Sequence, residues 1–314
     1  MKKRVAAFLI ILVILIILFS FPVSKKTSIS IVASFDNTMP QITNVYNWKN
    51  WYPSIKESFK NNPAGYSIIK DSSEKIYTIN TPDKKYIILA VTPMAYQVRE
   101  VTGNWEDIFA FSVFSGDTLG RMKIIIEKKS PLLLAILGKD KTGDVAINGL
   151  KMYLEDPKEF YGFNIGMSTI RDSVIASCVS KIRNRDVFLK IQEVYQKLLR
   201  YIQINNLLKS GHISISYNPI SDDSLQITVG IPVNKPAPPD KEINCLFLPA
   251  KGNVLVGNYE GKFSERKNIY QAMTKYLTDH SLSIPAESFE RYLNDSIPSS
   301  DRSMIRIELN YPVY

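Results

Sequence analysis

The sequence is poor in the residues from which metal and catalytic sites are commonly built. Its 314 residues include two histidines, His212 and His280, and two cysteines, Cys178 and Cys245. It contains no HExxH or GxSxG motif, no Cys-x-x-Cys pair and no glycine-rich phosphate loop. These absences argue against zinc, redox and nucleotide sites of the familiar types. We therefore expect no metal, no cofactor and no catalytic residue.

Both cysteines lie in apolar runs that are typical of strands. Burial as free thiols is the favoured interpretation, because free cysteine is among the most buried residue types. A single disulfide between Cys178 and Cys245 stays open as an alternative in an oxidising compartment.

The net charge of +9 is concentrated at one end of the chain. Lys2, Lys3, Arg4, Lys25 and Lys26 lie in the first 26 residues, where there is no acidic residue, so the rest carries 34 minus 30, or +4. No basic cluster interleaved with aromatic residues follows. The sequence therefore predicts no nucleic-acid partner.

A long apolar run occupies the first part of the chain. Residues 5–23, VAAFLIILVILIILFSFPV, contain no charge and are long enough to cross most of a bilayer core of about 30 Å. The following FSFPVSKK offers no A-x-A cleavage site, which favours an uncleaved anchor over a signal peptide. We expect residues 1–26 to form a transmembrane anchor of a single-pass membrane protein. The basic MKKR start predicts a cytoplasmic amino terminus and folded domains on the extracytoplasmic (periplasmic) side.

Residues 27–155 alternate between strand-like and helical patterns. SISIVASFDN predicts a strand, and TMPQITNVYNWKNWYPSIKES predicts helical structure containing Trp48 and Trp51, which we expect to fill a core. Five further strand-like runs, YSIIKD, KIYTINT, KYIILAVTP, WEDIFAFSVFS and GRMKIIIEKKS, predict an antiparallel meander. KTGDVAINGLKMYLEDP then predicts a closing helix.

This first domain resembles the START-like SRPBCC (polyketide cyclase-like) family. The matching residues are Asn47, Trp48 and Trp51 in an NWxxW element, and Gly149, Leu150 and Tyr153 in the closing helix. The resemblance implies a helix-grip domain, in which a sheet wraps around the long helix and encloses an apolar cavity.

The rest of the chain contains an internal duplication. YQKLLRYIQINNL at 195–207 aligns with YQAMTKYLTDHSL at 270–282, an offset of 75 residues. The same offset pairs Phe188 with Phe263 and Tyr217 with Tyr292, and both copies end alike, in ITVGIPV and IELNYPV. This predicts two repeats, 160–233 and 243–314, joined by the proline-rich residues 234–242.

Each repeat has the pattern of a β-α-β-β unit. The stretches 168–182 and 243–259 each predict one opening strand, an amphipathic helix follows, and two strands complete the unit. The predicted fold class is therefore α+β, with a transmembrane helix, a helix-grip domain and a duplicated domain with pseudo-twofold symmetry.

The second domain, residues 156–314, resembles the GyrI-like small-molecule-binding family, the effector-binding domain of AraC-type regulators. The resemblance is carried by LPAKGNVLVGNYEGKF, IYQAMTKYLTDHSL, ESFERYLNDS and the terminal RIELNYPV. It implies a ligand cleft between the repeats, lined by aromatic residues, with one glutamate in the strand after the second helix. No helix-turn-helix segment precedes the domain, so the regulators' DNA-binding role is not expected.

The glutamate of that pattern is Glu290. Strand alternation places Glu290 and Tyr292 on one face, and the first repeat has Ile215 and Tyr217 at the equivalent positions. The alternative is that Glu290 faces water or pairs with a nearby arginine. The complete set of predicted ligand-binding residues is Glu290, Tyr292, Tyr217, Tyr259 and Tyr161.

These observations favour a membrane-anchored protein that captures a small hydrophobic or cationic molecule between the repeats. One alternative is a hydrolase of a reactive small molecule, in which Glu290 activates water with Tyr292 or Tyr259 as its neighbour. Another is a non-catalytic interaction protein with degenerate pockets. Whether the chain is an enzyme is left open, with binding favoured.

Overall fold

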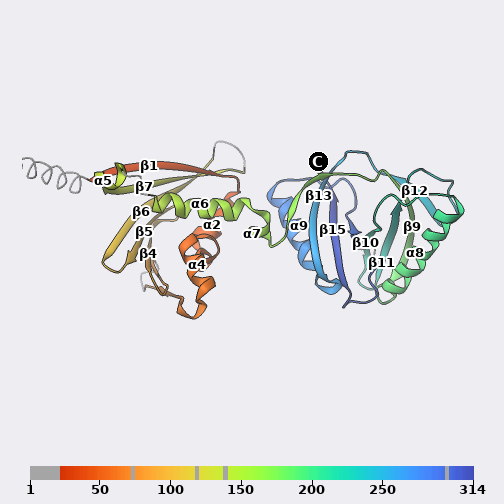
Figure 1. The fold of residues 1–314 in the computed structure, drawn as a ribbon, viewed down its shortest axis with the longest axis horizontal. Helices are drawn as coiled ribbons and strands as arrows, with labels where there is room; N and C mark the ends of the chain where they lie inside the picture. Colours follow the sequence, from red (N-terminus) through yellow and green to blue (C-terminus); the bar gives the residue numbers. More distant parts are fainter. Residues whose placement is uncertain (1–21, 72–74, 117–119, 137–140, 294–296) are drawn as a thin grey trace, which may run out of the picture. The chain divides into compact units, whose positions relative to one another are not determined.

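The chain folds into two compact units that divide between Asp156 and Pro157. A computed structural model describes residues 22–71, 75–116, 120–136, 141–293 and 297–314 (Figure 1). The units are described separately below, and each is built around one antiparallel sheet. They are called unit 1 and unit 2.

Unit 1 consists of a seven-stranded sheet with the order β1-β7-β6-β5-β4-β3-β2, and of helices. The strands are β1 (Pro22–Ile31), β2 (Ser67–Lys70), β3 (Ile76–Asn80), β4 (Lys85–Thr92), β5 (Ala95–Thr102), β6 (Trp105–Ser115) and β7 (Met122–Pro131). The helices are α2 (Phe35–Thr43), η1 (Val45–Asn47), α3 (Trp48–Trp51), α4 (Pro53–Asn61), η2 (Pro63–Gly65), α5 (Leu132–Ile136) and α6 (Thr142–Glu155).

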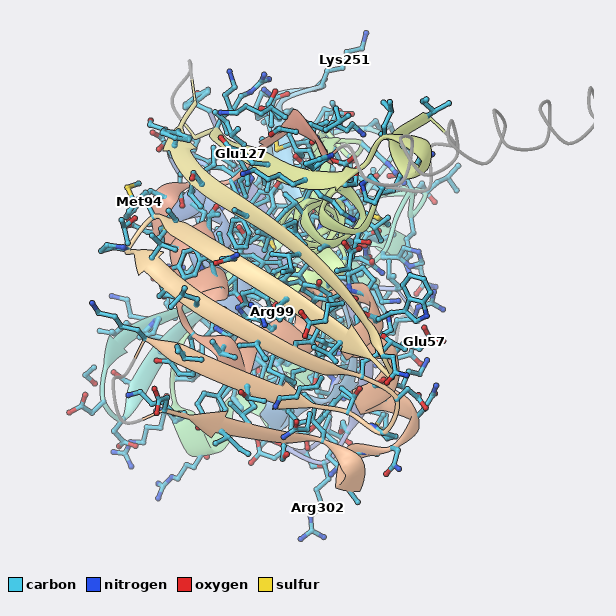
Figure 2. All side chains as sticks on the ribbon, turned by 90° about the vertical axis from the view of Figure 1, so that its left-hand side faces the viewer. Glu57, Met94, Arg99, Glu127, Lys251 and Arg302 are labelled. Atoms are coloured by element: carbon cyan, nitrogen blue, oxygen red, sulfur yellow. The ribbon has the colours of Figure 1, made fainter. Side chains whose placement is uncertain are left out.

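The sheet of unit 1 buries alternate residues of each strand, as period-two patterning requires. In β7 the residues Ile124 and Ile126 are buried, whereas Glu127 is exposed. In β5 the residues Val98 and Glu100 are buried, and Arg99 between them is exposed. Figure 2 shows Arg99 and Glu127 on the strands that face the viewer. The inward face therefore includes a buried carboxylate, Glu100.

The tryptophans of the NWxxW element lie in the core of unit 1. Trp48 and Trp51 are 0% and 2% exposed, and their indole nitrogens donate to the carbonyl oxygens of Ile42 and Gln41 at 2.9 Å. Trp48 also stacks on buried Tyr52, with ring centroids 5.5 Å apart. These aromatic side chains therefore fill the core of unit 1, as the sequence predicts for Trp48 and Trp51.

The resemblance of unit 1 to the SRPBCC family stays a prediction. Strand β5 was not predicted from the sequence. Its alternation is obscured because Glu100 occupies a position that faces the core. The meander has one more strand than expected for this reason.

The prediction of a membrane anchor requires correction. Residues 5–21 lie outside the described residues, and Pro22 and Val23 begin strand β1. The strand continues through Lys25 and Lys26, and its backbone pairs with β7 along its whole length. In the part of the chain that the structure describes, no helix is long and apolar enough to cross a membrane. The described chain therefore gives no support to the predicted transmembrane helix, single-pass membrane topology or extracytoplasmic location.

Unit 2 contains an eight-stranded antiparallel sheet with the order β12-β9-β11-β10-β14-β15-β13-β8. The strands are β8 (Ile165–Thr169), β9 (Val174–Arg183), β10 (Ser214–Ser221), β11 (Ser224–Pro232), β12 (Ile243–Phe247), β13 (Asn253–Lys262), β14 (Phe289–Tyr292) and β15 (Met304–Pro312). The helices are α7 (Pro157–Tyr161), η3 (Asn184–Asp186), α8 (Val187–Ile204), η4 (Phe263–Glu265) and α9 (Lys267–Asp279).

The duplication is visible in the order of the strands. Reading the sheet from either edge gives the same sequence of elements, with β9, β11 and β10 of one copy matching β13, β15 and β14 of the other. Each predicted opening strand is in fact two strands, because the chain breaks at 170–173 and again at 248–252. The first of each pair joins the other copy: β8 pairs with β13, and β12 pairs with β9.

The two copies meet where β10 pairs with β14. In this register Ile215 lies opposite Glu290, and these are the positions that the 75-residue offset makes equivalent. The equivalent rings of Phe188 and Phe263 also meet, with centroids 5.1 Å apart. The local pseudo-twofold axis therefore passes through the sheet beside Glu290. Cys178 and Cys245, on neighbouring strands, are both free thiols.

Gly149 offers a test of the packing in unit 1. A Cβ atom at this position of α6 would lie 2.4 Å from the carbonyl oxygen of Trp51. We expect Gly149→Ala to lower the free energy of unfolding by about 1–3 kcal/mol, since the overlap involves backbone. Urea unfolding followed by tryptophan fluorescence reports on unit 1, because all three tryptophans, including Trp105, lie there. Met152→Ala on the exposed side of α6 is the control, and an equal loss in both variants would contradict the expectation.

Candidate functional site

The most unusual side chain of unit 2 is a fully buried carboxylate. Glu290 lies in β14, and its exposed fraction is 0%. Strand alternation turns Glu290 and Tyr292 toward the interior, as the sequence pattern predicts. A buried ionised carboxylate costs several kcal/mol unless it is paired and hydrogen-bonded, so its partners define the site.

Three donors satisfy the carboxylate. Arg266 Nε and the Tyr270 hydroxyl donate to Oε1 of Glu290 at 2.8 Å and 2.7 Å. The Tyr292 hydroxyl donates to Oε2 at 2.6 Å and lies 3.0 Å from the hydroxyl oxygen of Tyr217. These hydrogen bonds offset part of the hydration that the carboxylate loses on burial.

Arg266 is the cation of this site, and it is also stacked on aromatic rings. It caps the start of α9, and its guanidinium carbon lies 3.5 Å from the ring centroid of Phe263 and 4.9 Å from that of Tyr217. Nη1 donates to the Phe263 carbonyl oxygen at 3.1 Å. The Arg266 side chain is 22% exposed, in contrast to the 0% of Glu290.

We call the six residues that share these contacts the seam cluster, because they gather where the two repeats meet. They come from η4, from the beginning of α9 and from the facing strands β10 and β14. The seam cluster consists of Tyr217, Phe263, Arg266, Tyr270, Glu290 and Tyr292.

The electrostatics of the cluster keep its phenols neutral and its guanidinium charged. Burial, reinforced by the Glu290 charge, raises the pKa of both Tyr217 and Tyr270 above the usual value. Burial and the neighbouring Tyr217 and Glu290 likewise raise the pKa of Tyr292. Burial by itself would lower the pKa of Arg266, but the Glu290 carboxylate outweighs it and the pKa is raised.

The structure brings together three of the five predicted ligand-binding residues: Glu290, Tyr292 and Tyr217. The hydroxyl of Tyr259 instead donates to the Lys262 carbonyl oxygen at 2.6 Å, at the end of its own strand β13. Tyr161 donates to Asp279 at 2.8 Å, at the far end of α9 from Arg266. The roles of all five in ligand binding stay predictions.

Sequence reasoning missed Arg266, Tyr270 and Phe263 as members of the site. The 75-residue offset contained the signal, because it places Arg266 opposite Ile191 just as it places Glu290 opposite Ile215. Both isoleucines are fully buried. One repeat therefore has an apolar pair where the other has an ion pair, and a search for paired asymmetries would have found the arginine.

The arrangement suits holding a charge better than transferring a proton. Both oxygens of Glu290 already accept hydrogen bonds from three protein donors, and the side chain is 0% exposed. Within the described residues, no group of three or more histidine, cysteine, aspartate and glutamate side chains is placed to hold a metal ion.

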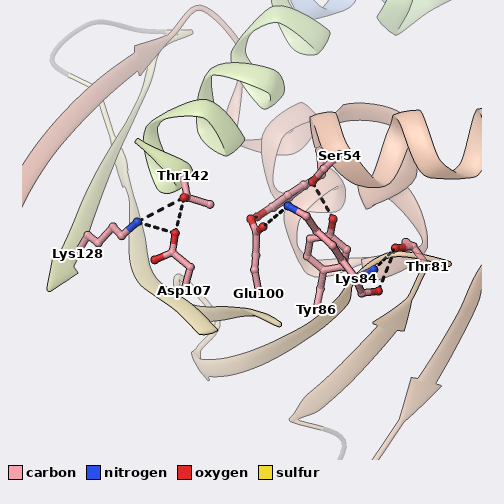
Figure 3. A network of polar contacts seen from close by, with 9 residues as sticks. Ser54, Thr81, Lys84, Tyr86, Glu100, Asp107, Lys128 and Thr142 are labelled. Atoms are coloured by element: carbon pink, nitrogen blue, oxygen red, sulfur yellow. Dashed lines mark hydrogen bonds and ion pairs between the residues drawn. The ribbon is translucent and has the colours of Figure 1, made fainter. Parts of the chain in front are cut away.

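A second polar network lies in unit 1 (Figure 3). Lys84 Nζ lies 3.3 Å from Oε2 of buried Glu100, which also accepts from the Tyr52 hydroxyl. On the other side, Lys128 Nζ lies 2.7 Å from Oδ2 of Asp107, which the Thr142 hydroxyl also reaches. A cavity of about 510 Å³ borders both ion pairs. Charged and hydroxyl-bearing residues make up most of its lining.

Known structures resemble this chain over part of its length. EcmrR, solved with DNA by cryo-electron microscopy, covers 58% of this chain and 69% of its own, with 14% identity and a TM-score of 0.43. The EcmrR C-terminal domain covers 48% and 98%, with 15% identity and a TM-score of 0.38. SAV2435, solved bound to tetraphenylphosphonium, covers 48% and 93%, with 16% identity and a TM-score of 0.30.

The EcmrR C-terminal domain and SAV2435 have GyrI-like effector-binding folds, the class that unit 2 resembles in sequence. These likenesses are too distant to say what this chain binds. No protein-family model and no curated protein matches the chain.

The first repeat provides a template for removing the ion pair. Arg266→Ile leaves Glu290 buried and unpaired, so we expect a loss of about 3–5 kcal/mol in the free energy of unfolding. Glu290→Ile should cost less, because the 22% exposed Arg266 can turn toward water. The double variant, which copies Ile191 and Ile215, should regain most of the loss.

Urea unfolding followed by far-ultraviolet circular dichroism measures all three variants. Additive losses in the double variant would show that the two charges do not stabilise each other.

The buried phenols predict how stability depends on pH. In an unfolded chain tyrosine ionises near pH 10, whereas the folded pKa of Tyr217, Tyr270 and Tyr292 is raised. The three residues therefore contribute no pH dependence below about pH 10, and they lower the free energy of unfolding as the pH rises above it.

Urea midpoints between pH 8 and pH 11 test this dependence. Tyr217→Phe should flatten the alkaline decline by up to about 1.4 kcal/mol per pH unit, and Tyr46→Phe at an exposed position is the control. A decline of equal steepness in both variants would refute the assignment.

Proposed function

We propose that unit 2 binds a small organic cation with an apolar body at the seam cluster. The observation that carries the proposal is that the cluster already holds a guanidinium between a carboxylate and two aromatic rings. A charge partner, an aromatic face and a low-dielectric setting are the features that cation sites in proteins combine. Charge pairing and the cation-π contact act on the same ligand atom group.

The aromatic residues favour a ligand with apolar surface over a bare ion. Phe263, Tyr270 and Tyr292 offer ring faces and edges, and their hydroxyl groups are occupied within the cluster or absent. A ligand body that packs against these rings gains about 25 cal/mol for each Å² of its own apolar surface that it buries. The asymmetry between the repeats supplies one carboxylate, with its arginine partner, in an otherwise duplicated aromatic frame.

The proposal is tested by thermal unfolding of the full chain with tetraphenylphosphonium. Tetraphenylborate, an anion of nearly the same shape, is the matched control for charge. We expect the phosphonium at saturation to raise the melting temperature by about 5 °C and the borate to leave it unchanged. The preference follows from the Glu290 carboxylate.

Two variants locate the effect. Glu290→Gln should abolish the shift in melting temperature. Glu308→Gln should retain it, because Glu308 lies on β15 and pairs with Arg291 outside the seam cluster. Equal shifts with both ions, or a shift that survives in Glu290→Gln, would exclude the seam cluster as a cation site.

A further inference from the structure

The cation now in the seam cluster belongs to the chain itself. Arg266 makes every contact that a bound guanidinium ligand would make there: an ion pair with Glu290, a stack on Phe263 and a hydrogen bond to the Phe263 carbonyl oxygen. Its planar group lies 3.5 Å from the ring centroid. The site is thus shaped for a flat cation with several hydrogen-bond donors.

The fold does not need this ion pair. At the equivalent positions the first repeat has Ile191 and Ile215, both fully buried, and the same β-α-β-β unit forms around them. A buried ion pair is a weak source of stability, because the cost of removing both charges from water offsets most of their attraction. The pair in the second repeat is therefore better explained by a role in binding than by a role in folding.

The geometry lets only one member of the pair leave. Glu290 is 0% exposed and is held in β14 by its strand partners. Arg266 stands at the start of α9 with 22% of its side chain exposed, and a long flexible side chain can rotate there into water. Its departure would uncover the carboxylate and both stacking rings without unfolding the helix.

We propose that Arg266 is a tethered occupant of the seam cluster, displaced by ligands that carry a guanidinium or amidinium group. The inference rests on the proposed cation-binding function. It adds the class of ligand and the side chain, Arg266, that competes with the ligand for the site. A side chain tethered beside its site competes at a high effective concentration, so the native protein binds such ligands weakly. The aromatic stack selects planar cations, because a compact ammonium presents no flat face to Phe263.

Chemical rescue of Arg266→Ala tests the proposal. This variant leaves a guanidinium-sized space beside an unpaired Glu290. We expect methylguanidinium at millimolar concentration to raise its melting temperature and to bind it about tenfold or more tightly than it binds the native full chain. Methylammonium should produce a much smaller effect.

The chain offers a matched control in Arg291. This arginine is also mostly buried and ion-paired, with Glu308 at 3.0 Å and Asp172 at 3.4 Å. No aromatic ring of the described residues stacks on Arg291, so Arg291→Ala should show no comparable rescue. The double variant Arg266→Ala/Glu290→Gln should lose the rescue, since the carboxylate is gone.

If Arg266→Ala does not fold, Arg266→Gln keeps a polar side chain of similar reach, and the affinity of methylguanidinium is compared in that variant. Equal rescue of Arg291→Ala, or equal affinity for the native chain and both Arg266 variants, overturns the inference. Should the phosphonium still bind the native chain through Glu290 in that case, the proposed function stands without it. If Arg266→Ala is rescued but the native chain binds no cation, Arg266 is the occupant of the seam cluster. The proposed cation-binding function of the native chain is then wrong.

Discussion

A carboxylate without access to water constrains unit 2 more than any other single feature. Glu290 is sealed in the sheet beside the pseudo-twofold axis, and the negative charge must be matched within hydrogen-bond distance. Arg266 supplies the matching charge, and Tyr270 and Tyr292 supply the remaining donors. The stacking of Arg266, the neutrality of the phenols and the cation specificity that we propose all depend on this one requirement.

Unit 1 meets a similar requirement in a different way. Glu100 is also buried, and it is matched by Lys84 and Tyr52 rather than by a stacked arginine. Lysine is a compact, strongly hydrated charge, whereas arginine can lie flat on a ring and still donate hydrogen bonds. The first network closes the end of a sheet beside a polar cavity, and the second arranges a flat cation among aromatic faces.

Much of unit 2 could be predicted from the sequence because duplication and strand alternation are periodic signals. They located the repeats, turned Glu290 and Tyr292 inward and paired Tyr217 with Tyr292. The exchange of β8 and β12 between copies could not be predicted, because the sequence pattern does not show which copy a strand joins. The breaks themselves are marked by the polar residues 171–173 and by Pro249 and Gly252. Strand β5 was missed because Glu100 faces the core, where the alternating pattern of a strand leads one to expect an apolar residue.

The predicted anchor failed for a different reason. The charge that ends an apolar run does not show whether the residues that follow begin a strand, and Lys25 and Lys26 are both part of β1.

Arg266 was missed because an arginine at the start of a helix is common on protein surfaces. Its role depends on a neighbour 24 residues away, across the contact between helix and sheet.

The interaction on which the account depends can be observed directly by nuclear magnetic resonance of the full chain labelled with ¹⁵N-arginine. We predict one Nε–H signal that exchanges with solvent far more slowly than those of exposed arginines, that disappears in Arg266→Lys and that loses its protection in Glu290→Gln. If the Arg266 signal exchanges as fast as those of exposed arginines in the native protein, the buried charge of Glu290 is not matched by Arg266 and the account is wrong.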